Sequence, residues 1–356
     1  MGKWESGGLG KGAKMRYREL GKTGLTVSAI GLGCAQLGSS NADYAVRVVR
    51  QALDLGVTYI DLARGYRDAE IKVGLALRAG APARERLVIS TKTSRRTREE
   101  AWREIHESLE RIGTGYLDNV HLHGLRSSQD IDQRLGPGGA MEAALEAQQA
   151  GKVRHIGVSS HSLEVALQMV PTGHFETIQF PFNYITREPA DELLPLAQAH
   201  DLGFIAMKPF AGGLLDKANL SIKWLLQFPG VVPDPGIETV EEMAEIVRIL
   251  EGGSELTPRE RGEIQDVRHE LGTRFCRRCE YCQPCPQEIA ISTVMNIRSF
   301  YQRFPPERFF SGRFPQTVER AKTCLECGEC EERCPYQLPI REMLVENVAF
   351  FESVRP

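Results

Sequence analysis

The sequence has neither a long apolar segment nor an excess of charge of one sign. Its 356 residues contain 44 Lys and Arg and 47 Asp and Glu, a formal net charge of -3 with a pI near 6.3. Because no basic excess gathers phosphates, nucleic acid is not an expected partner. No apolar run approaches the roughly 18 to 20 residues that cross a bilayer, and residues 1–14 lack an apolar signal core. We therefore expect a cytoplasmic protein without a membrane partner, in which residues 1–14 form a flexible extension.

Cysteine is almost absent from the first three quarters of the chain. Only Cys34 precedes residue 276, and the other eight cysteines lie between Cys276 and Cys334. A disulfide framework would distribute its cysteines over the whole fold, and a cytoplasmic chain keeps its thiols reduced. The distribution therefore predicts a metal-binding domain in the last part of the sequence.

Short β-branched apolar runs alternate with amphipathic helical stretches from Met15 to about Gly253. We expect eight strands, at residues 27–33, 58–63, 87–93, 119–125, 155–160, 177–182, 203–210 and 231–236. Helical periodicity lies between them, as in 41–55 and 97–112. Eight such repeats favour an α/β fold in which residues 15–253 form a (β/α)8 TIM barrel. An open dinucleotide-binding sheet would have a glycine-rich turn after its first strand, and the complete motif is missing here.

Polar residues stand at the ends of three successive predicted strands. They are Asp61, Tyr66, Lys92 and His123, and functional groups of such a barrel lie at the C-terminal ends of its strands. A lysine ammonium stabilises a neighbouring phenolate and lowers the tyrosine pKa, while a carboxylate holds the ammonium in place. An imidazole can orient or protonate a carbonyl oxygen. Each residue alone has a structural explanation, but together they predict a catalytic group.

Five segments, in the same order, resemble the aldo-keto reductase family. They are residues 15–38, 59–66, 89–92, 117–123 and 151–160, and the likeness extends over about two thirds of the chain. The resemblance implies hydride transfer between NADP(H) or NAD(H) and a small-molecule carbonyl or alcohol substrate. It also implies that Tyr66 is the proton donor, that Lys92 and Asp61 tune it, and that His123 orients the carbonyl.

The resemblance further implies where the cofactor binds. The expected cofactor-binding residues are Ser159, Ser160, Gln179, Met207, Lys208, Pro209, Gly212 and Gly236. Ser159 and Gln179 would hold the nicotinamide carboxamide, whereas Met207 departs from the tyrosine that commonly stacks on the ring. The loop from Gly236 lacks the cation expected to pair with a 2′-phosphate, and Glu238 would repel one. NADPH and NADH therefore both stay open.

The late cysteines form two runs, each followed by proline. The first run is Cys276, Cys279, Cys282 and Cys285, and the second is Cys324, Cys327, Cys330 and Cys334. The second spacing matches the bacterial ferredoxin run, and the first differs by one residue in its last gap. In two-cluster ferredoxins the fourth cysteine of each run ligates the other cluster. This pattern pairs Cys334 with the first three cysteines and Cys285 with the first three of the second run.

Residues 254–356 are expected to form a small α-helical ferredoxin-like domain with two 4Fe-4S clusters. The segment 286–322 between the runs has a helical pattern, which resembles that fold. Eight thiolates could instead build two zinc sites. A nicotinamide transfers two electrons as hydride and a cluster transfers one, so a reductase could use the clusters as structure or redox sensor. Alternatively, they could connect an electron-transfer partner to the barrel. The substrate, an aldehyde, ketone or sugar, stays open.

Overall fold

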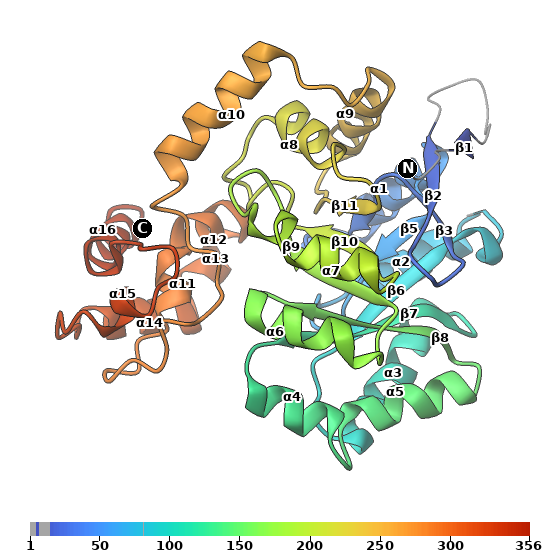
Figure 1. Ribbon diagram of the computed structural model, residues 1–356, viewed down its shortest axis with the longest axis horizontal. Helices are drawn as coiled ribbons and strands as arrows, with labels where there is room; N and C mark the ends of the chain where they lie inside the picture. Colours follow the sequence, from blue (N-terminus) through green and yellow to red (C-terminus); the bar gives the residue numbers. More distant parts are fainter. Residues whose placement is uncertain (1–4, 7–14, 81) are drawn as a thin grey trace. The chain divides into compact units, whose positions relative to one another are not determined.

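The structure, a computed structural model, describes residues 5–6, 15–80 and 82–356 (Figure 1). They form two compact units: the chain up to Phe210 with Lys217–Leu256, and Ala211–Asp216 with Thr257–Pro356. Of the extension predicted at residues 1–14, all but residues 5 and 6 lie outside the described residues. The flexibility of that extension and the predicted boundary after residue 253 stay predictions.

Eight parallel strands form the sheet of the first unit, in sequential order from β4 to β11 (Figure 1). They are β4 (Leu32–Gly33), β5 (Tyr59–Asp61), β6 (Val88–Thr93), β7 (Leu117–Leu125), β8 (Val153–Ser160), β9 (Thr177–Pro181), β10 (Gly203–Met207) and β11 (Val231–Asp234). Parallel neighbours joined in sequence through helices are the arrangement of a (β/α)8 barrel. The predicted fold class is confirmed.

The first and last strands meet along a seam, which we define by Gly31, Gly33, Pro233 and Pro235. The N–H of Gly31 donates to the carbonyl of Pro233, and the N–H of Gly33 donates to the carbonyl of Pro235, each at 2.8 Å. A Cβ at Gly33 would lie only 2.7 Å from the Pro235 carbonyl oxygen, so the close approach requires glycine. Hydrogen bonds at the seam thus join the first strand to the last, and the barrel is nearly closed.

Helices follow the strands and bury their apolar faces. They are α1 (Ala42–Asp54), α2 (Ala69–Arg78), α3 (Arg98–Ile112), α4 (Ser128–Leu135), α5 (Ala140–Gln149), α6 (Leu163–Met169), α7 (Leu193–Ala199), α8 (Ala218–Leu225) and α9 (Val240–Glu251). Asn41 caps α1 by accepting from the N–H groups of Asp43 and Tyr44, and Thr239 forms a capping box with Glu242 at α9. The helices predicted at 41–55 and 97–112 are confirmed as α1 and α3.

The first predicted strand, residues 27–33, is wrong as a single element. Thr26–Ser28 forms β3, which pairs antiparallel with β2 (Arg16–Glu19), and β2 pairs with β1 (Glu5–Ser6). Only Leu32–Gly33 joins the barrel. The hydroxyl of Ser28 donates to the carbonyl of Ile30 at 2.6 Å. This local bond competes with sheet pairing and bends the chain between the two sheets.

The described residues of the second unit form helices joined by loops. Its helices are α10 (Pro258–Leu271), α11 (Ile291–Met295), α12 (Ile297–Arg303), α13 (Pro306–Phe309), α14 (Arg313–Ala321), α15 (Glu329–Glu332) and α16 (Ile340–Ser353). One of its cores is aromatic, with Phe300, Phe309, Phe314 and Phe351. A second core contains Cys282 and Cys330. The predicted helical character of this region is confirmed.

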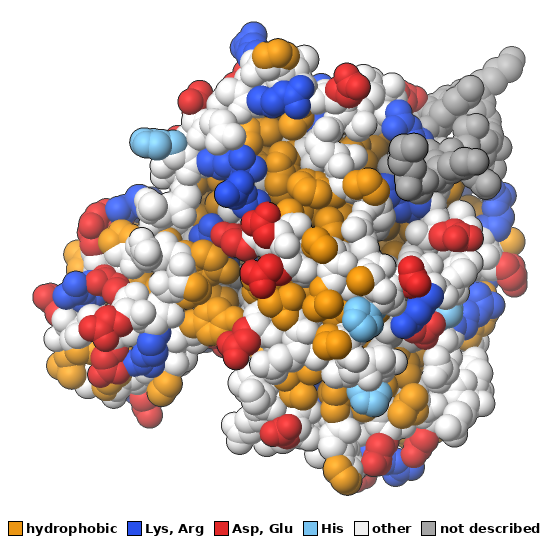
Figure 2. All heavy atoms as spheres, viewed as in Figure 1, with side chains coloured by type: hydrophobic (Ala, Val, Ile, Leu, Met, Phe, Trp, Pro, Cys, Tyr) orange, Lys and Arg blue, Asp and Glu red, His pale blue; other side chains and the backbone are white. Residues whose placement is uncertain are grey.

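Among the described residues, no helix combines the length and the apolar character that a bilayer span requires. Figure 2 shows basic and acidic side chains beside one another on the visible surface of each unit. This distribution agrees with the small net charge of the sequence.

Candidate active site and cysteine sites

The structure brings Asp61, Tyr66, Lys92 and His123 together at the strand ends. Asp61 ends β5, Lys92 lies in β6, His123 lies in β7, and Tyr66 follows β5 in a loop. The Lys92 ammonium donates to Asp61 Oδ2 at 2.5 Å, to the Leu62 carbonyl at 2.6 Å and to the Tyr66 hydroxyl at 3.4 Å. The rings of Tyr66 and His123 are 6.2 Å apart and nearly perpendicular. The four side chains predicted from the sequence are therefore neighbours in space.

Burial dominates the ionisation of Tyr66. It raises the pKa of Tyr66 to about 12, although the Lys92 ammonium opposes part of that rise. The expectation that Lys92 brings this pKa below its ordinary value is wrong, because burial outweighs the nearby charge. Burial is the largest single influence on the pKa of Lys92 and acts to lower it, but the neighbouring acidic groups, Asp61 first among them, together outweigh burial and the Lys92 pKa is raised. Tyr66 thus keeps its proton at neutral pH, and Lys92 stays charged.

His123 is neutral at neutral pH. Burial, with the charges of Lys92, Arg134 and Arg126, lowers the pKa of His123 to about 3. A neutral imidazole can donate one hydrogen bond but holds no extra proton to release. Arg134 Nη1 donates to the backbone carbonyl of His123 at 2.9 Å and fixes this part of β7. Of the two chemical roles expected for His123, this geometry favours orienting a carbonyl over protonating it.

Three of the expected cofactor residues are buried, two at the end of β8 and one in the middle of β9. Ser159 Oγ accepts from the N–H of Gly124 at 2.8 Å, which leaves its own proton available to a ligand. Ser160 Oγ instead donates to the carbonyl of Leu125 at 2.7 Å, so its proton is used inside the protein. Gln179 Nε2 also has an internal partner, described below. Ser159 therefore offers a ligand its hydroxyl proton, whereas Ser160 does not.

The remaining expected cofactor residues lie in two places. Met207 ends β10, and Lys208, followed by Pro209, has a left-handed backbone with φ of 56°. Gly236 follows β11, where a Cβ would lie 2.5 Å from the amide oxygen of Gln36. That oxygen, Gln36 Oε1, is buried and has no hydrogen-bond partner in the part of the chain that the structure describes. A nicotinamide carboxamide could supply the missing donor, so this part of the site fits the expected cofactor.

Gly212, another expected cofactor residue, belongs to the second unit. Its carbonyl accepts from the hydroxyl of Ser299 in α12 at 2.7 Å. The backbone at Gly212 is left-handed, with φ of 77°. The hydrogen bond that the structure shows for Gly212 is therefore one within the helical unit, and its role in cofactor binding stays a prediction.

Asp234 is a buried residue of this site that the sequence reasoning missed. It ends β11, is 5% exposed, and its Oδ2 accepts from Gln179 Nε2 at 3.1 Å. Burial, followed by the charge of Asp61, raises the pKa of Asp234 well above its usual value. An acidic residue at the end of the eighth predicted strand was the available signal. The rule that identified Asp61, Lys92 and His123 applies equally to Asp234.

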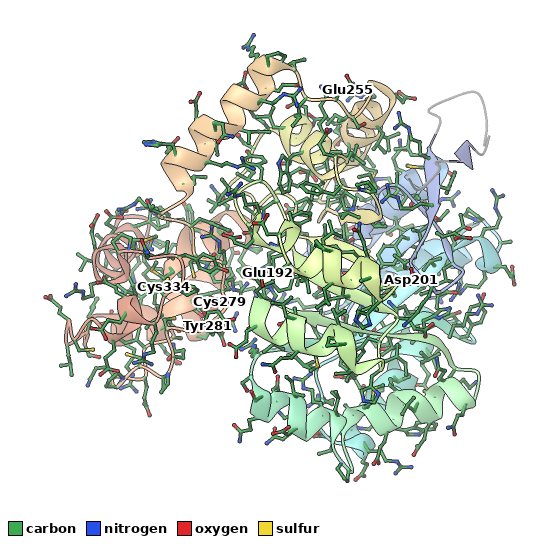
Figure 3. All side chains as sticks on the ribbon, viewed as in Figure 1. Glu192, Asp201, Glu255, Cys279, Tyr281 and Cys334 are labelled. Atoms are coloured by element: carbon green, nitrogen blue, oxygen red, sulfur yellow. The ribbon has the colours of Figure 1, made fainter. Side chains whose placement is uncertain are left out.

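Two hollows in the second unit are lined by its cysteines. The smaller, with about 340 Å³ of empty space that includes open solvent, is lined by Cys276, Cys279, Cys282 and Cys334. The larger, with about 410 Å³ by the same measure, is lined by Cys282, Cys285, Cys324, Cys327 and Cys330. Figure 3 shows Cys279, Tyr281 and Cys334 of the smaller hollow close together. Each hollow therefore contains the four cysteines that the ferredoxin pattern pairs.

The spacing of these thiols bears on the kind of metal they could hold. In the part of the chain that the structure describes, no three Cys, His, Asp or Glu side chains converge enough to hold a single ion. A tetrahedral zinc ion with bonds of about 2.3 Å needs sulfur atoms only about 4 Å apart. In a 4Fe-4S cluster each cysteine binds a different iron of the cubane, so the cysteine sulfurs lie further apart than around a single ion. Each hollow, with its cysteine thiols, offers the donor set that a 4Fe-4S cluster requires.

The two cysteine runs share a backbone pattern. Left-handed conformations occur at Arg278 (φ 62°) and Glu280 (φ 68°) in the first run, and at Glu326 (φ 53°) and Gly328 (φ 82°) in the second. In each run these positions lie two residues after the first cysteine and one residue after the second. The turns direct N–H groups inward, as where the N–H of Arg278 bonds to the sulfur of Cys276. The repeat supports a duplicated binding unit.

Burial keeps several of these thiols protonated when no metal is bound. It raises the pKa of Cys279 to about 11 and the pKa of Cys282 to about 12. A thiol must lose its proton to ligate a metal. Metal binding here is therefore coupled to proton release.

A (β/α)8 barrel with a Lys–Asp–Tyr–His group, joined to a helical unit with ferredoxin-type cysteine runs, defines an iron–sulfur oxidoreductase of the barrel class. Residues 29–223 match the aldo/keto reductase family, and residues 275–339 match a 4Fe-4S dicluster domain. The chain belongs to the aldo/keto reductase family and carries a 4Fe-4S dicluster domain after its barrel.

Relatives of this chain include characterised and uncharacterised oxidoreductases. An uncharacterized oxidoreductase of Bacillus subtilis is 32% identical over 59% of this chain and 71% of the relative. The L-galactose dehydrogenase of Arabidopsis thaliana is 32% identical over 57% of this chain and 67% of the relative. The L-glyceraldehyde 3-phosphate reductase of Escherichia coli (strain K12) is also 32% identical, over 57% and 63%.

Solved aldo-keto reductases share the barrel. The holo form of a Bacillus halodurans aldo-keto reductase has a TM-score of 0.61 at 26% identity, covering 71% of this chain and 96% of that chain. A Klebsiella pneumoniae aldo-keto reductase in complex with NADPH has a TM-score of 0.60 at 26% identity, covering 72% and 95%. Both comparisons support an oxidoreductase barrel for this chain.

Proposed function

We propose that the barrel reduces the carbonyl group of a small molecule with a nicotinamide nucleotide, and that Tyr66 supplies the proton. The observation that carries the proposal is the 3.4 Å contact of the Lys92 ammonium with the Tyr66 hydroxyl, beside the Lys92–Asp61 ion pair. Tyr66 is protonated at neutral pH, as a proton donor must be. The relatives that are named as reductases and dehydrogenases support the same class of reaction.

The residues divide the work on the carbonyl oxygen. Tyr66 donates its hydroxyl proton to that oxygen, and the Lys92 ammonium stabilises the phenolate that remains. Asp61 keeps Lys92 in place, and the neutral imidazole of His123 donates a hydrogen bond to the same oxygen. The nicotinamide, when bound, supplies the hydride, so the aldehyde or ketone becomes an alcohol.

The cofactor would be held by residues on several strand ends. Ser159, Gln179 and Gln36 would contact the carboxamide, and Met207 would contact the ring. Ser160 has its proton committed to Leu125, so it would contribute through its backbone. Lys208 and Pro209 belong to the segment expected beneath the pyrophosphate, and Gly236 is a further expected cofactor-binding residue.

The charges of the loop after β11 do not favour NADPH over NADH. The carboxylate of Glu242 accepts from the N–H groups of Glu238 and Thr239 at 2.7 and 3.0 Å. These N–H groups are thus occupied, and two carboxylates would stand near a 2′-phosphate placed at this loop. The Klebsiella pneumoniae relative is in complex with NADPH, so assays of this chain should include both nucleotides.

Tyr66→Phe tests the catalytic assignment. The substitution removes the proton donor and leaves the ring in place, so we expect kcat for reduction of aldehydes, ketones or sugars to fall by about 10²–10⁴-fold. Steady-state assays with NADH and NADPH measure this fall. Tyr116→Phe is the matched control, because the buried Tyr116 hydroxyl has no hydrogen-bond partner among the described residues, while the guanidinium groups of Arg84 and Arg154 lie over the ring that phenylalanine keeps. An unchanged rate for Tyr66→Phe would remove the assigned role.

We further propose two 4Fe-4S clusters in the second unit, one in each cysteine-lined hollow. The paired cysteine sets and the repeated left-handed turns support this number. Two cubanes require about eight irons and eight sulfides per chain. Iron, acid-labile sulfide and zinc analysis of protein purified without oxygen measures this content. Zinc without sulfide would contradict the proposal.

A second candidate function is electron transfer between the barrel and a redox partner. Cys327 is exposed, whereas Cys282 and Cys330 are buried, so a cluster held by the second run would lie close to the surface. A cluster transfers one electron at a time. Bleaching of its visible absorption by NADH or NADPH without oxygen would support this function, and an unchanged spectrum would support a structural role.

A further inference from the structure

Two carboxyl groups from distant parts of the chain share the barrel interior beside Lys92. Asp61 ends β5 and Asp234 ends β11, and they are 2% and 5% exposed. Asp61 Oδ2 accepts from Lys92, and Asp234 Oδ2 accepts from Gln179. The other oxygen of each carboxyl, Oδ1, is buried and has no hydrogen-bond donor among the described residues.

The space for this pair comes from a glycine of the seam. A Cβ at Gly31 would lie 3.1 Å from Asp234 Oδ1 and 2.8 Å from the ring of Tyr59. A larger residue at position 31 would therefore displace the carboxyl or the ring. The backbone is shaped to admit the Asp234 side chain at this point.

The carboxyl groups of Asp61 and Asp234 lie within hydrogen-bonding reach of each other, so a single proton between them would satisfy both unpartnered oxygens. Two ionised carboxylates would repel each other and leave two buried acceptors without donors, which is unfavourable on both counts. A protonated carboxyl can donate to a facing carboxylate oxygen. Burial and the charge of Asp61 raise the pKa of Asp234 well above its usual value, and Lys92 opposes the rise only in part. The proton therefore belongs on Asp234.

The other titratable groups around the pair do not supply a competing charge. Burial raises the pKa of Tyr59 and of Cys34 well above their usual values, so both are neutral. Gln179 is uncharged. The charges of this region are then the single positive charge of Lys92 and the single negative charge that the two carboxyls share.

We propose that Asp234 is a positioning residue, whose protonated carboxyl donates a hydrogen bond to Asp61 Oδ1 and whose other oxygen orients the amide of Gln179. Both oxygens of Asp61 are then fixed, which holds Lys92 toward Tyr66. Because Gln179 Nε2 is committed to Asp234, Gln179 Oε1 is the atom left for a ligand. The effect on catalysis rests on the proposed function, whereas the protonation of Asp234 does not.

Infrared spectroscopy tests the proton directly. Ordinary carboxyl groups are ionised at neutral pH, so a protonated carboxyl gives a separate C=O band that shifts in D2O. We expect a difference spectrum of wild type against Asp234→Asn, both full-length with metal bound, to show this band in wild type alone. Absence of the band from wild type would overturn the proposal. This readout does not depend on any substrate, so failure of Tyr66→Phe to affect activity would leave it intact.

Kinetics then tests the positioning role. In Asp234→Asn the amide can donate to Asp61 and accept from Gln179, as the protonated acid does, so we expect a few-fold change at most and an unaltered pH profile. Asp234→Leu removes both contacts, and we expect kcat/KM to fall by about 10–100-fold, as for other residues that orient a catalytic group, with a shifted pH profile. An altered profile in Asp234→Asn would mean that the wild-type residue is ionised, and would also overturn the proposal.

Discussion

The barrel and the helical unit bury chemically active groups in opposite ways. In the barrel, the charge of Lys92 is balanced by Asp61, 2.5 Å away, so the site is assembled from the chain alone. In the helical unit, Cys282 and Cys330 belong to the same core as Ile289 and Leu344, yet they line hollows that no side chain fills. The barrel site should therefore be stable before it binds anything, whereas the core of the helical unit depends on its metal.

The largest expected effect comes from removing one buried cluster ligand. Cys330→Ser should release the iron of one hollow and unfold much of the helical unit, because it opens a core that the metal completes. Iron content, with hydrogen exchange resolved by segment, measures both changes. Cys34→Ser is the matched control, since Cys34 is a buried cysteine of the barrel. Comparable exchange in the two variants would break the contrast between the units.

The next effect tests the charge balance between Lys92 and Asp61 in the barrel. Lys92→Met leaves the Asp61 carboxylate without its cation, and we expect a loss of about 3–5 kcal/mol in the free energy of unfolding. Lys72→Met is the control. Lys72 is also buried, but it donates to the carbonyls of Leu37, Gly38 and Ser40. Urea unfolding of the barrel should show the smaller loss for Lys72→Met, and equal losses would argue against charge balance as the cause.

The most gradual expected effect is a pH dependence of barrel stability, spread over several pH units and with opposite signs at two residues. His123 has a folded pKa of about 3, below the ordinary value near 6.5, so the unfolded chain binds the proton first. Stability is then lost as pH falls from about 6.5 toward 3, by at most about 1.4 kcal/mol per unit. Asp234 has a raised pKa, so the unfolded chain loses the proton first, and stability falls as pH rises above about 4.

Single variants separate these two contributions. His123→Gln should reduce the loss in acid, and Asp234→Asn should reduce the loss at higher pH. Urea unfolding across a pH series measures both slopes, with His200→Gln as the control at an exposed histidine. Identical slopes in Asp234→Asn and wild type would mean that Asp234 holds no proton in the folded barrel.

Much of the fold was predictable because its signals are local. Apolar runs marked eight strands, and periodicity marked α1 and α3. The split of the first strand was not predictable from apolarity, because it depends on the hydrogen bond from Ser28 to Ile30. The turns in the cysteine runs were also not predictable, because most of their left-handed positions are not glycine. Of the four left-handed positions, only Gly328 is a glycine, and Arg278, Glu280 and Glu326 give no such signal.

The candidate site was predictable where a residue acts at the end of its own strand. Asp61, Lys92 and His123 follow that rule. They are close in space because their strands are adjacent and parallel in the sheet. The net effect on the Tyr66 pKa was not predictable, because it depends on burial that only the folded barrel defines. Asp234 also ends its own strand, so the same rule reaches it. Its pairing with Asp61 was not predictable, because no sequence pattern relates residues 173 positions apart.

The seam is the part of the barrel where we expect local opening. β4 contributes only Leu32 and Gly33, so few backbone hydrogen bonds hold the first strand to the last. Amides of Gly31 and Gly33 should therefore exchange with solvent before those of longer strands such as β7. Because Asp234 stands between Pro233 and Pro235 of the seam, loss of its proton would place a second negative charge at this joint. At alkaline pH we therefore expect the barrel to open first at the seam.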